Sequence, residues 1–300
     1  LPVEEESPAE EELPVEEESP AEEELPVEEE SPAEEELPVE EGSPVSEEPS
    51  VEEAPPYAAE TPASPDIDAE PIVALSFEEA LGRIAQDTAT AGVPNNGKLY
   101  GGAEWTDAGK VGGAIALDGR NDLMMLNSSP DLNLGNAVDQ RTVAMWFNAA
   151  AVDTDKAQVI FEAGGLFHGG MNIYLEDDLL YFGAWSGAEN NWQGSWLSTD
   201  EVTSGKWHHV AVVLDAPINT QSGADGTLTA YLDGQAVGQT TGVALQSHPD
   251  PIGLGNVSLT TRFENGYGFL GNSGLAGAID EVQVFNDALS GQQVRQLTLV

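Results

Sequence analysis

Three of the six tryptophans of this 300-residue chain lie within the stretch 184–197. They are Trp185, Trp192 and Trp196, and the amide side chains between them are Asn190, Asn191 and Gln193. Indole rings pack on the apolar faces of sugars, and amides bond pairs of hydroxyls. The stretch therefore predicts a carbohydrate or glycoconjugate site. The alternative is that Trp185 and Trp196 end strands and face the core, which leaves Trp192 as the one in mid-loop.

A second loop, residues 261–273 with the sequence TRFENGYGFLGNS, is also rich in aromatic side chains. It contributes Arg262, Tyr267 and Phe269. Loops carried on a rigid β-sandwich are common places for binding residues. This loop either adds to a binding site or shapes the edge of the domain.

Side-chain patterns that support catalysis are absent from the sequence. Sandwich glycanases carry paired carboxylates on one strand face, but the acids at 176–178 are contiguous, and Asp280 and Glu281 are adjacent and so point apart. There is no cysteine and no G-x-S-x-G nucleophile motif. His208 and His209 also point to opposite faces, so they cannot chelate one metal. We therefore expect no enzyme activity.

Many short apolar strands separated by turn residues must position these groups. Alternation or β-branched composition predicts strands at 73–77, 112–119, 141–148, 158–162, 171–175, 179–185, 204–215, 228–232 and 279–285. Acids at 176–178 and Asp233-Gly234 mark turns. Strands of this length with almost no helix predict an all-β sandwich.

The strand 279–285 organises the end of the domain. Strict alternation places Asp280, Val282 and Val284 on one face, which the valines mark as the core side. A carboxylate buried there needs a partner. Ser290 and Gln293 then form a capping box, which predicts a short helical turn carrying Val294 and Leu297.

Several landmarks together resemble laminin-G-like domains over residues 73–298. They are Phe77-Glu78-Glu79, Asn95-Asn96-Gly97, GKVGGA at 109–114, Leu117-Asp118-Gly119, GKWHHVA at 205–211, YLDG at 231–234 and IDEV at 279–282. The resemblance implies an antiparallel two-sheet jelly-roll sandwich of the concanavalin A-like type. Many relatives hold an ion where the first and last strands meet. By position, the resemblance implies a structural calcium site with Asp280 and Glu78, joined by Asp118 or Asp122, while the alternative is that Asp280 only accepts backbone hydrogen bonds.

Residues 1–72 differ from the rest of the chain. The unit LPVEEESPAEEE occurs three times in residues 1–36, and a fourth copy decays after Leu37. Two prolines and six glutamates per unit oppose helix, sheet and core formation. We expect an extended, disordered spacer or linker over 1–72 and the jelly-roll domain over 73–300. Weak calcium buffering or a specific partner are the alternatives for the tail.

The charge distribution limits the possible partners. The chain has a formal net charge of −45; residues 1–72 hold 28 of its 54 acids and none of its nine Lys and Arg, which leaves a net −17 on the remainder. Phosphate binding needs basic side chains, so we expect no nucleic-acid partner. No apolar run reaches the roughly 20 residues that span a bilayer, so we expect no membrane insertion.

These observations lead to one expected function with two alternatives. We expect a secreted or surface-displayed module, of a kind found in bacteria, that binds a glycan without catalysis. The first alternative is a structural or adhesion domain that binds an extracellular protein. The second is a glycan-active enzyme.

Overall fold

The computed structural model describes residues 67–187, 194–216 and 226–300. Almost all of its regular structure is strand. The acidic repeats and the residues Asn190, Asn191, Trp192 and Gln193 lie outside the described ranges. The expected tail and its boundary at residue 72 therefore stay predictions.

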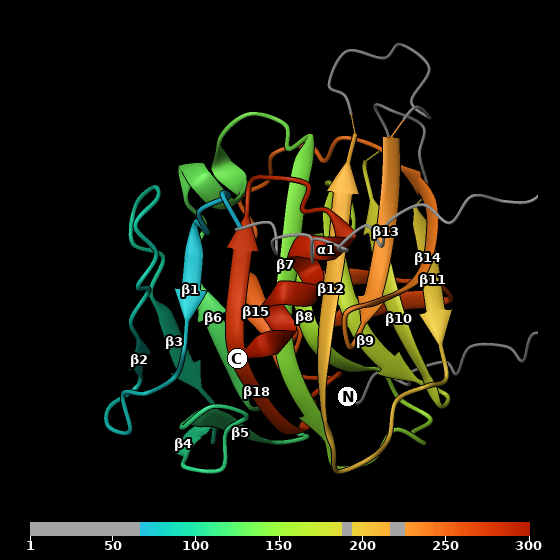
Figure 1. Cartoon of the computed structure of the whole chain (residues 1–300). Coiled ribbons are helices and arrows are strands. Elements are labelled where there is room, and N and C mark those ends of the chain that lie inside the picture. Colours follow the sequence, from blue (N-terminus) through green and yellow to red (C-terminus); the bar gives the residue numbers. More distant parts are fainter. Residues whose placement is uncertain (1–66, 188–193, 217–225) are drawn as a thin grey trace, which may run out of the picture. The chain divides into compact units, whose positions relative to one another are not determined.

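The strands form two eight-stranded sheets and one separate hairpin (Figure 1). Sheet A contains β1 (Val73–Leu75), β4 (Glu104–Thr106), β5 (Ala114–Asp118), β7 (Gln140–Ala149), β12 (Trp207–Asp215), β13 (Gly226–Leu232), β14 (Gln235–Gly242) and β18 (Ala276–Phe285). Sheet B contains β2 (Ile84–Ala85), β3 (Gly97–Tyr100), β6 (Leu123–Leu126), β8 (Gln158–Gly164), β9 (Gly170–Glu176), β10 (Leu179–Trp185), β11 (Ser195–Thr199) and β15 (Ile252–Leu254). The hairpin is β16 (Thr260–Phe263) with β17 (Gly266–Phe269).

The strand order confirms the predicted jelly-roll sandwich. Sheet A runs β14-β13-β12-β7-β18-β5-β4 with β1 also paired to β18, and sheet B runs β11-β10-β9-β8-β15-β6-β3-β2. All of these strand pairs are antiparallel. The apolar inner faces of the two sheets form the main core, which includes Phe147, Phe161, Phe182, Leu254 and Ile279. Burial of these side chains is the main stabilising contribution to such a fold.

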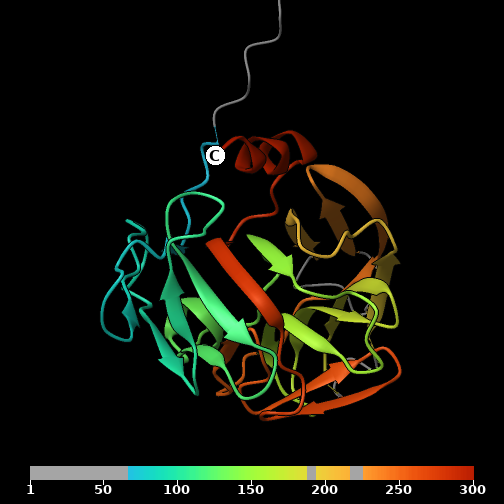
Figure 2. The ribbon, with the colours of Figure 1, turned by 90° about the horizontal axis from the view of Figure 1, so that it is seen from below.

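The predicted helical turn is present. Helix α1 (Gly291–Gln296) begins after Ser290, whose side chain caps the backbone N–H of Gln293, while Gln293 caps the N–H of Ser290. Val294 and Leu297 are buried in a second apolar cluster outside sheet A. Figures 1 and 2 place α1 against the outer side of this sheet. The other short helices among the described residues are a π-helical turn, η1 (Pro130–Leu134), and a 3₁₀ turn, η3 (Leu297–Leu299).

The strict alternation predicted for β18 is wrong at one point. A β-bulge interrupts the pairing of β18 with β7 between Asp280 and Gln283, and Glu281 has a φ of +50°. The bulge inserts an extra residue, so Ile279 and Val282 both reach the core. Asp280 is paired with Trp146 and therefore lies with it on the outer face of sheet A. The buried carboxylate is thus aimed away from the main core.

The outer face of sheet B is covered by the segment that leads into the β16–β17 hairpin. Phe263 packs there with Tyr174 and Tyr181, whose rings are stacked with centroids 4.8 Å apart. Asn172 donates a hydrogen bond to the backbone carbonyl of Arg262. The hairpin is thereby held against the sheet, with its own outer side chains facing solvent.

Candidate functional site

Two hollows meet at one end of the sandwich and share Asp155, Lys156, Ala157 and Asn272. Their volumes are about 680 and 600 Å³. We call the continuous depression the rim groove. It is built from chain segments far apart in the sequence: the β5–β6 turn, the β7–β8 loop, the β9–β10 turn, the β16–β17 hairpin and the segment leading into β18.

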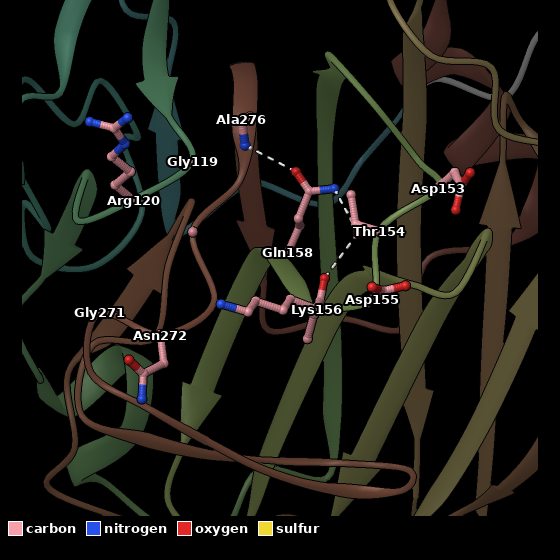
Figure 3. A pocket seen from close by; sticks show the side chains of 12 residues that line it. Gly119, Arg120, Asp153, Thr154, Asp155, Lys156, Gln158, Gly271, Asn272 and Ala276 are labelled. Atoms are coloured by element: carbon pink, nitrogen blue, oxygen red, sulfur yellow. Dashed lines mark hydrogen bonds between the residues drawn. The ribbon is translucent and has the colours of Figure 1, made fainter.

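A buried glutamine fixes the centre of the rim groove. Gln158 accepts a hydrogen bond from the N–H of Ala276 at 3.1 Å and donates to the carbonyl of Ala151 and the hydroxyl of Thr154 (Figure 3). Thr154 in turn donates to the carbonyl of Lys156 at 3.0 Å. The loop that presents Lys156 is therefore tied to the first residue of β18.

Aromatic side chains form one part of the rim groove. Tyr267 and Phe269, on β17, are 61% and 48% exposed. The two alternate along one strand and so share a face, while Phe263 is buried beneath the hairpin. An exposed aromatic ring beside a hollow offers an apolar platform that a folded chain does not need for its own packing.

Polar and cationic side chains form the other part. The lining includes Asn265, Asn272, Asp153, Asp155, Asp177, Glu176, Arg120 and Lys156. Within the described residues, no carboxylate lies within 4.0 Å of the Lys156 amine or the Arg120 guanidinium. In Figure 3 Lys156 extends from its loop toward the side of Asn272, away from Asp153. The rim groove therefore offers free cationic donors in an acidic protein.

The two tryptophans of the predicted sugar site that the structure describes stack on each other. Trp185 is fully buried and donates from Nε1 to the carbonyl of Gly165 at 3.0 Å. The half-buried ring of Trp196 lies parallel to it, with centroids 6.4 Å apart and planes 7° apart. In this conformation Trp185 supports Trp196 from below and is not itself accessible to a ligand. The buried Nε1 of Trp196 has no partner among the described residues.

Sequence reasoning did not identify most of the rim groove. Tyr267, Phe269 and Asn272 belong to the aromatic loop at 261–273, but Lys156 and Asp155 belong to no motif. The β9–β10 turn that borders the groove lies at the end of β10 opposite Trp185, about 20 Å away at roughly 3.3 Å per residue. Trp185 is therefore remote from that turn, whereas Trp196 packs against the apolar cluster that includes Phe263, one of the residues lining the groove.

The acids predicted to bind calcium divide into two groups. Asp280 is buried and accepts hydrogen bonds from the backbone N–H groups of Val111 at 3.0 Å and Glu281 at 2.8 Å. Glu78 accepts from the N–H of Gly113 at 2.9 Å. Burial, together with repulsion from Asp280 and Glu78, raises the pKa of Glu281 to about 7. Glu78, Asp280 and Glu281 therefore form one acidic cluster that a cation would relieve.

Asp118 and Asp122 lie elsewhere. Asp118 is opposite Ala276 on the neighbouring strand, at the other end of the paired segment from Asp280. Asp122 is buried and accepts from the N–H groups of Gly102 and Asp118, so it ties two turns together. The structure brings Glu78 toward Asp280, but it does not bring Asp118 or Asp122 there.

The acidic cluster provides the hard oxygen donors that suit calcium. Across residues 67–187, 194–216 and 226–300, no three His, Cys, Asp or Glu side chains are grouped so that they alone could hold a metal ion. Backbone carbonyls and water would therefore complete any coordination shell at Glu78, Asp280 and Glu281. Both carboxylate oxygens of Asp280 already accept hydrogen bonds from backbone N–H groups.

The adjacent histidines behave as expected of packed residues. His208 lies beside Phe147 and pairs through Nδ1 with Asp233 at 2.8 Å. His209 makes an edge contact with Trp146 on the other face, and burial lowers its pKa to about 4. The two rings point to opposite faces, as the sequence predicted.

A further buried acid, Glu162 on β8, lies on the outer face of sheet B. Its Oε1 accepts a hydrogen bond from the N–H of Ser258 at 2.7 Å, and Oε2 has no partner in the described part of the chain. Burial raises its pKa to about 8. The carboxyl therefore holds its proton at neutral pH, and its side chain pins the segment that covers the sheet.

Comparison with known proteins bears on this architecture. Residues 118–295 match a family model described as the concanavalin A-like lectin/glucanases superfamily. No curated protein sequence matches the chain. No helix among the described residues is long and apolar enough to cross a bilayer.

Solved structures with a similar fold include binding domains of toxins. The binding domain of Paraclostridial Mosquitocidal Protein 1 is 14% identical with a TM-score of 0.55. The match covers 76% of this chain and 52% of that chain. The botulinum neurotoxin serotype D binding domain is 11% identical with a TM-score of 0.56 and coverage of 76% and 50%. A serotype D ligand-binding domain in complex with N-acetylneuraminic acid is 13% identical with a TM-score of 0.55 and the same coverage.

This chain thus spans about half the length of those solved chains. At 11–14% identity, the likeness shows a shared fold. The family model, in contrast, covers more than half of this sequence and agrees with the two-sheet topology. The chain therefore belongs to the concanavalin A-like lectin/glucanase superfamily.

Proposed function

We propose that this domain is a non-catalytic module that binds a carbohydrate or glycoconjugate in the rim groove. The observation that carries the proposal is the exposure of Tyr267 beside a groove that also offers amides, carboxylates and free cations. Each hollow falls within the range of roughly 300–1,000 Å³ typical of ligand sites. A sugar ring would stack on Tyr267 or Phe269, and Asn265 and Asn272 would orient its hydroxyls.

The cations favour an acidic sugar. Lys156 and Arg120 are two of only nine basic residues in a chain of net charge −45, and both line one hollow of the groove. A sugar carboxylate placed there would gain charge-assisted hydrogen bonds. One structural neighbour has N-acetylneuraminic acid bound, but the preference for this chain rests on its own two cations.

Calcium binding is the second part of the proposal. The ion would lie at Glu78, Asp280 and Glu281, where the raised pKa values of Asp280 and Glu281 express unrelieved repulsion and burial. Its role would be structural, since it would join the loop that follows β1 to the bulge in β18. The ion would then stabilise the folded state by mass action.

A glycan array probed with the full chain, with and without calcium, tests the sugar proposal. We expect binding to acidic oligosaccharides, weaker binding to their neutral counterparts, and loss of binding in Tyr267→Ala. An array with no bound glycan in calcium would contradict the proposal.

Protein adhesion is the alternative that one feature favours. Leu259, Phe269 and Leu270 are all about half exposed and adjacent, since Leu270 donates its N–H to the carbonyl of Leu259 and Phe269 pairs with Thr260. An exposed apolar patch of this kind suits contact with another protein.

For both functions we propose that the protein is secreted or displayed on the cell surface, with the acidic repeats as a spacer.

A further inference from the structure

Arg141 is a buried cation with no counter-charge beside it in the described part of the chain. Arg141, on β7, is 6% exposed. One of its terminal nitrogens, Nη2, donates to the carbonyls of Leu132 at 3.0 Å and Asp131 at 3.4 Å. Its Nε is buried and has no partner, and no described carboxylate lies within 4.0 Å of the guanidinium. Burial lowers its pKa to about 10, so the group remains cationic at neutral pH.

A small cavity has Arg141 in its wall. Its volume is about 20 Å³, and its polar lining includes Arg141, Asn133 and His248. The apolar part of the wall comes from both sheets, through Val143, Phe161, Ala163 and Met171, and from the bridged residues Val138 and Leu245. A space of this size holds one water-sized species, since about 10–15 Å³ is the minimum for a water.

The other polar groups of the wall leave the charge uncompensated. Asn133 donates to the carbonyl of Asp250 and lies 3.5 Å from Nδ1 of His248. Burial lowers the pKa of His248 to about 4, so this imidazole is neutral at neutral pH. A buried charge without an opposite charge is strongly unfavourable. A water molecule would satisfy Nε but would leave the positive charge in place.

We propose that this cavity binds one small monovalent anion of the halide type, held by Arg141 Nε. The small volume excludes sulfate, phosphate and sugar carboxylates. Because Arg141 also bonds to the carbonyls of η1, the anion would stabilise the attachment of η1 to β7 at this end of the sandwich. The site is independent of the rim groove and of the acidic cluster.

Thermal unfolding of the full chain in different sodium salts tests the site. At equal ionic strength, chloride or bromide should raise the melting temperature in a saturable way relative to gluconate, since a ligand bound only to the folded state stabilises it. Arg141→Met should abolish the difference between the salts. Lys206→Met, which removes an exposed cation from the β11–β12 connection, should retain it.

Crystals grown in bromide give a direct readout. We expect one anomalous peak in the cavity within hydrogen-bond distance of Arg141 Nε. If Arg141→Met does not fold, Ala163→Val narrows the same cavity while keeping the guanidinium, and it should remove both the peak and the halide dependence. Equal melting in bromide and gluconate, or a cavity that contains only water, would overturn the proposal.

Discussion

The side chain of Gln158 joins the β7–β8 loop to β18 through the N–H of Ala276, at 3.1 Å. This contact links two segments more than 100 residues apart at the centre of the rim groove. The groove is therefore a product of the tertiary fold, and its geometry should depend on one buried amide.

Replacing that amide should weaken both stability and binding. Gln158→Met keeps the volume but loses the bonds to Ala276, Ala151 and Thr154, at a cost of about 1–3 kcal/mol for the groups left unpaired. For a domain of this size, the melting temperature should fall by about 2–10 °C. Gln239→Met, which removes an exposed amide bonded to Thr229, is the control. Equal melting of both variants and wild type would show that the Gln158 bonds contribute nothing.

The aromatic platform gives the sharpest functional prediction. Tyr267→Ala should leave the melting temperature within about 1–2 °C of wild type, because an exposed ring contributes little to folding. Its glycan affinity should fall at least tenfold, which is about 1.4 kcal/mol. Phe167→Ala, which removes an exposed ring from the β8–β9 loop at the end of β8 away from Gln158, should bind normally. Isothermal titration with a glycan selected from the array measures the affinity of each variant. Equal affinities for the two variants would place the site elsewhere.

Trp192 provides a separate prediction for the tryptophan-rich stretch. It belongs to a Gly/Asn-rich loop outside the described residues, so the prediction rests on the sequence. Should the glycan bind at this stretch rather than in the rim groove, Trp192→Ala would keep the fold and weaken glycan binding at least tenfold, about 1.4 kcal/mol. Trp185→Ala should instead lose about 3–5 kcal/mol of stability, because its indole is fully buried. Denaturant unfolding of both variants separates the two roles, and an unfolded Trp192→Ala would make that residue part of the core.

Calcium should affect stability through the acidic cluster. Chelation should lower the melting temperature of wild type, and Asp280→Asn should reproduce the loss and abolish the response to calcium. Because Asp280 also accepts backbone hydrogen bonds, Glu78→Gln on the exposed side provides a second variant that preserves them. An unchanged melt in excess chelator would rule out a structural ion.

Glu162 should limit stability at alkaline pH. Its folded pKa of about 8 exceeds the ordinary value of 4.5, so the folded state holds a proton that the unfolded state releases. The contribution of Glu162 to stability is therefore full below about pH 4.5 and falls as the pH rises toward 8. Glu162→Gln should match wild type near pH 5 and exceed it at pH 8.5 by several kcal/mol, on the order of 3–5.

Urea unfolding at the two pH values measures this difference. The exposed Glu201→Gln should show no such gain. The buried His209 and His248, with pKa values of about 4, act in the opposite direction. Their contribution to the free energy of unfolding decreases as the pH falls from about 6.5 toward 4. This decrease is the same in wild type and in Glu162→Gln, so it cancels when the two proteins are compared. A Glu162→Gln variant that tracks wild type at both values would contradict the protonated, buried state.

Local features of the fold could be predicted from the sequence because each depends on neighbouring residues. The turn at Asp233-Gly234 has left-handed φ values of +49° and +75°, as its residues favour. The capping box at Ser290 also depends only on residues nearby in the chain. The strand 141–148 is extended by just one residue at each end in β7.

Features that depend on distant segments could not be predicted. The bulge at Glu281 reverses the face of Asp280, and nothing in the alternation of β18 marks it. The segment that covers Glu162 includes Ser258, which lies nearly 100 residues later in the chain and donates its N–H to the carboxyl group. The rim groove likewise combines Lys156 with Tyr267 and Asn272, which share no motif with it. Position in the tertiary fold, more than residue type, gives these side chains their roles.

The place of β18 in sheet A has a consequence for biosynthesis. This strand pairs with β1, β5 and β7, yet every other strand of both sheets precedes it in the chain. Until residues 276–285 leave the ribosome, β5 and β7 have no partner on that side, and their apolar edges stay open. Pairing over such sequence distances is slow. The domain should therefore complete its folding only once β18 has left the ribosome, with the exposed edges vulnerable to aggregation or chaperone capture in the interval.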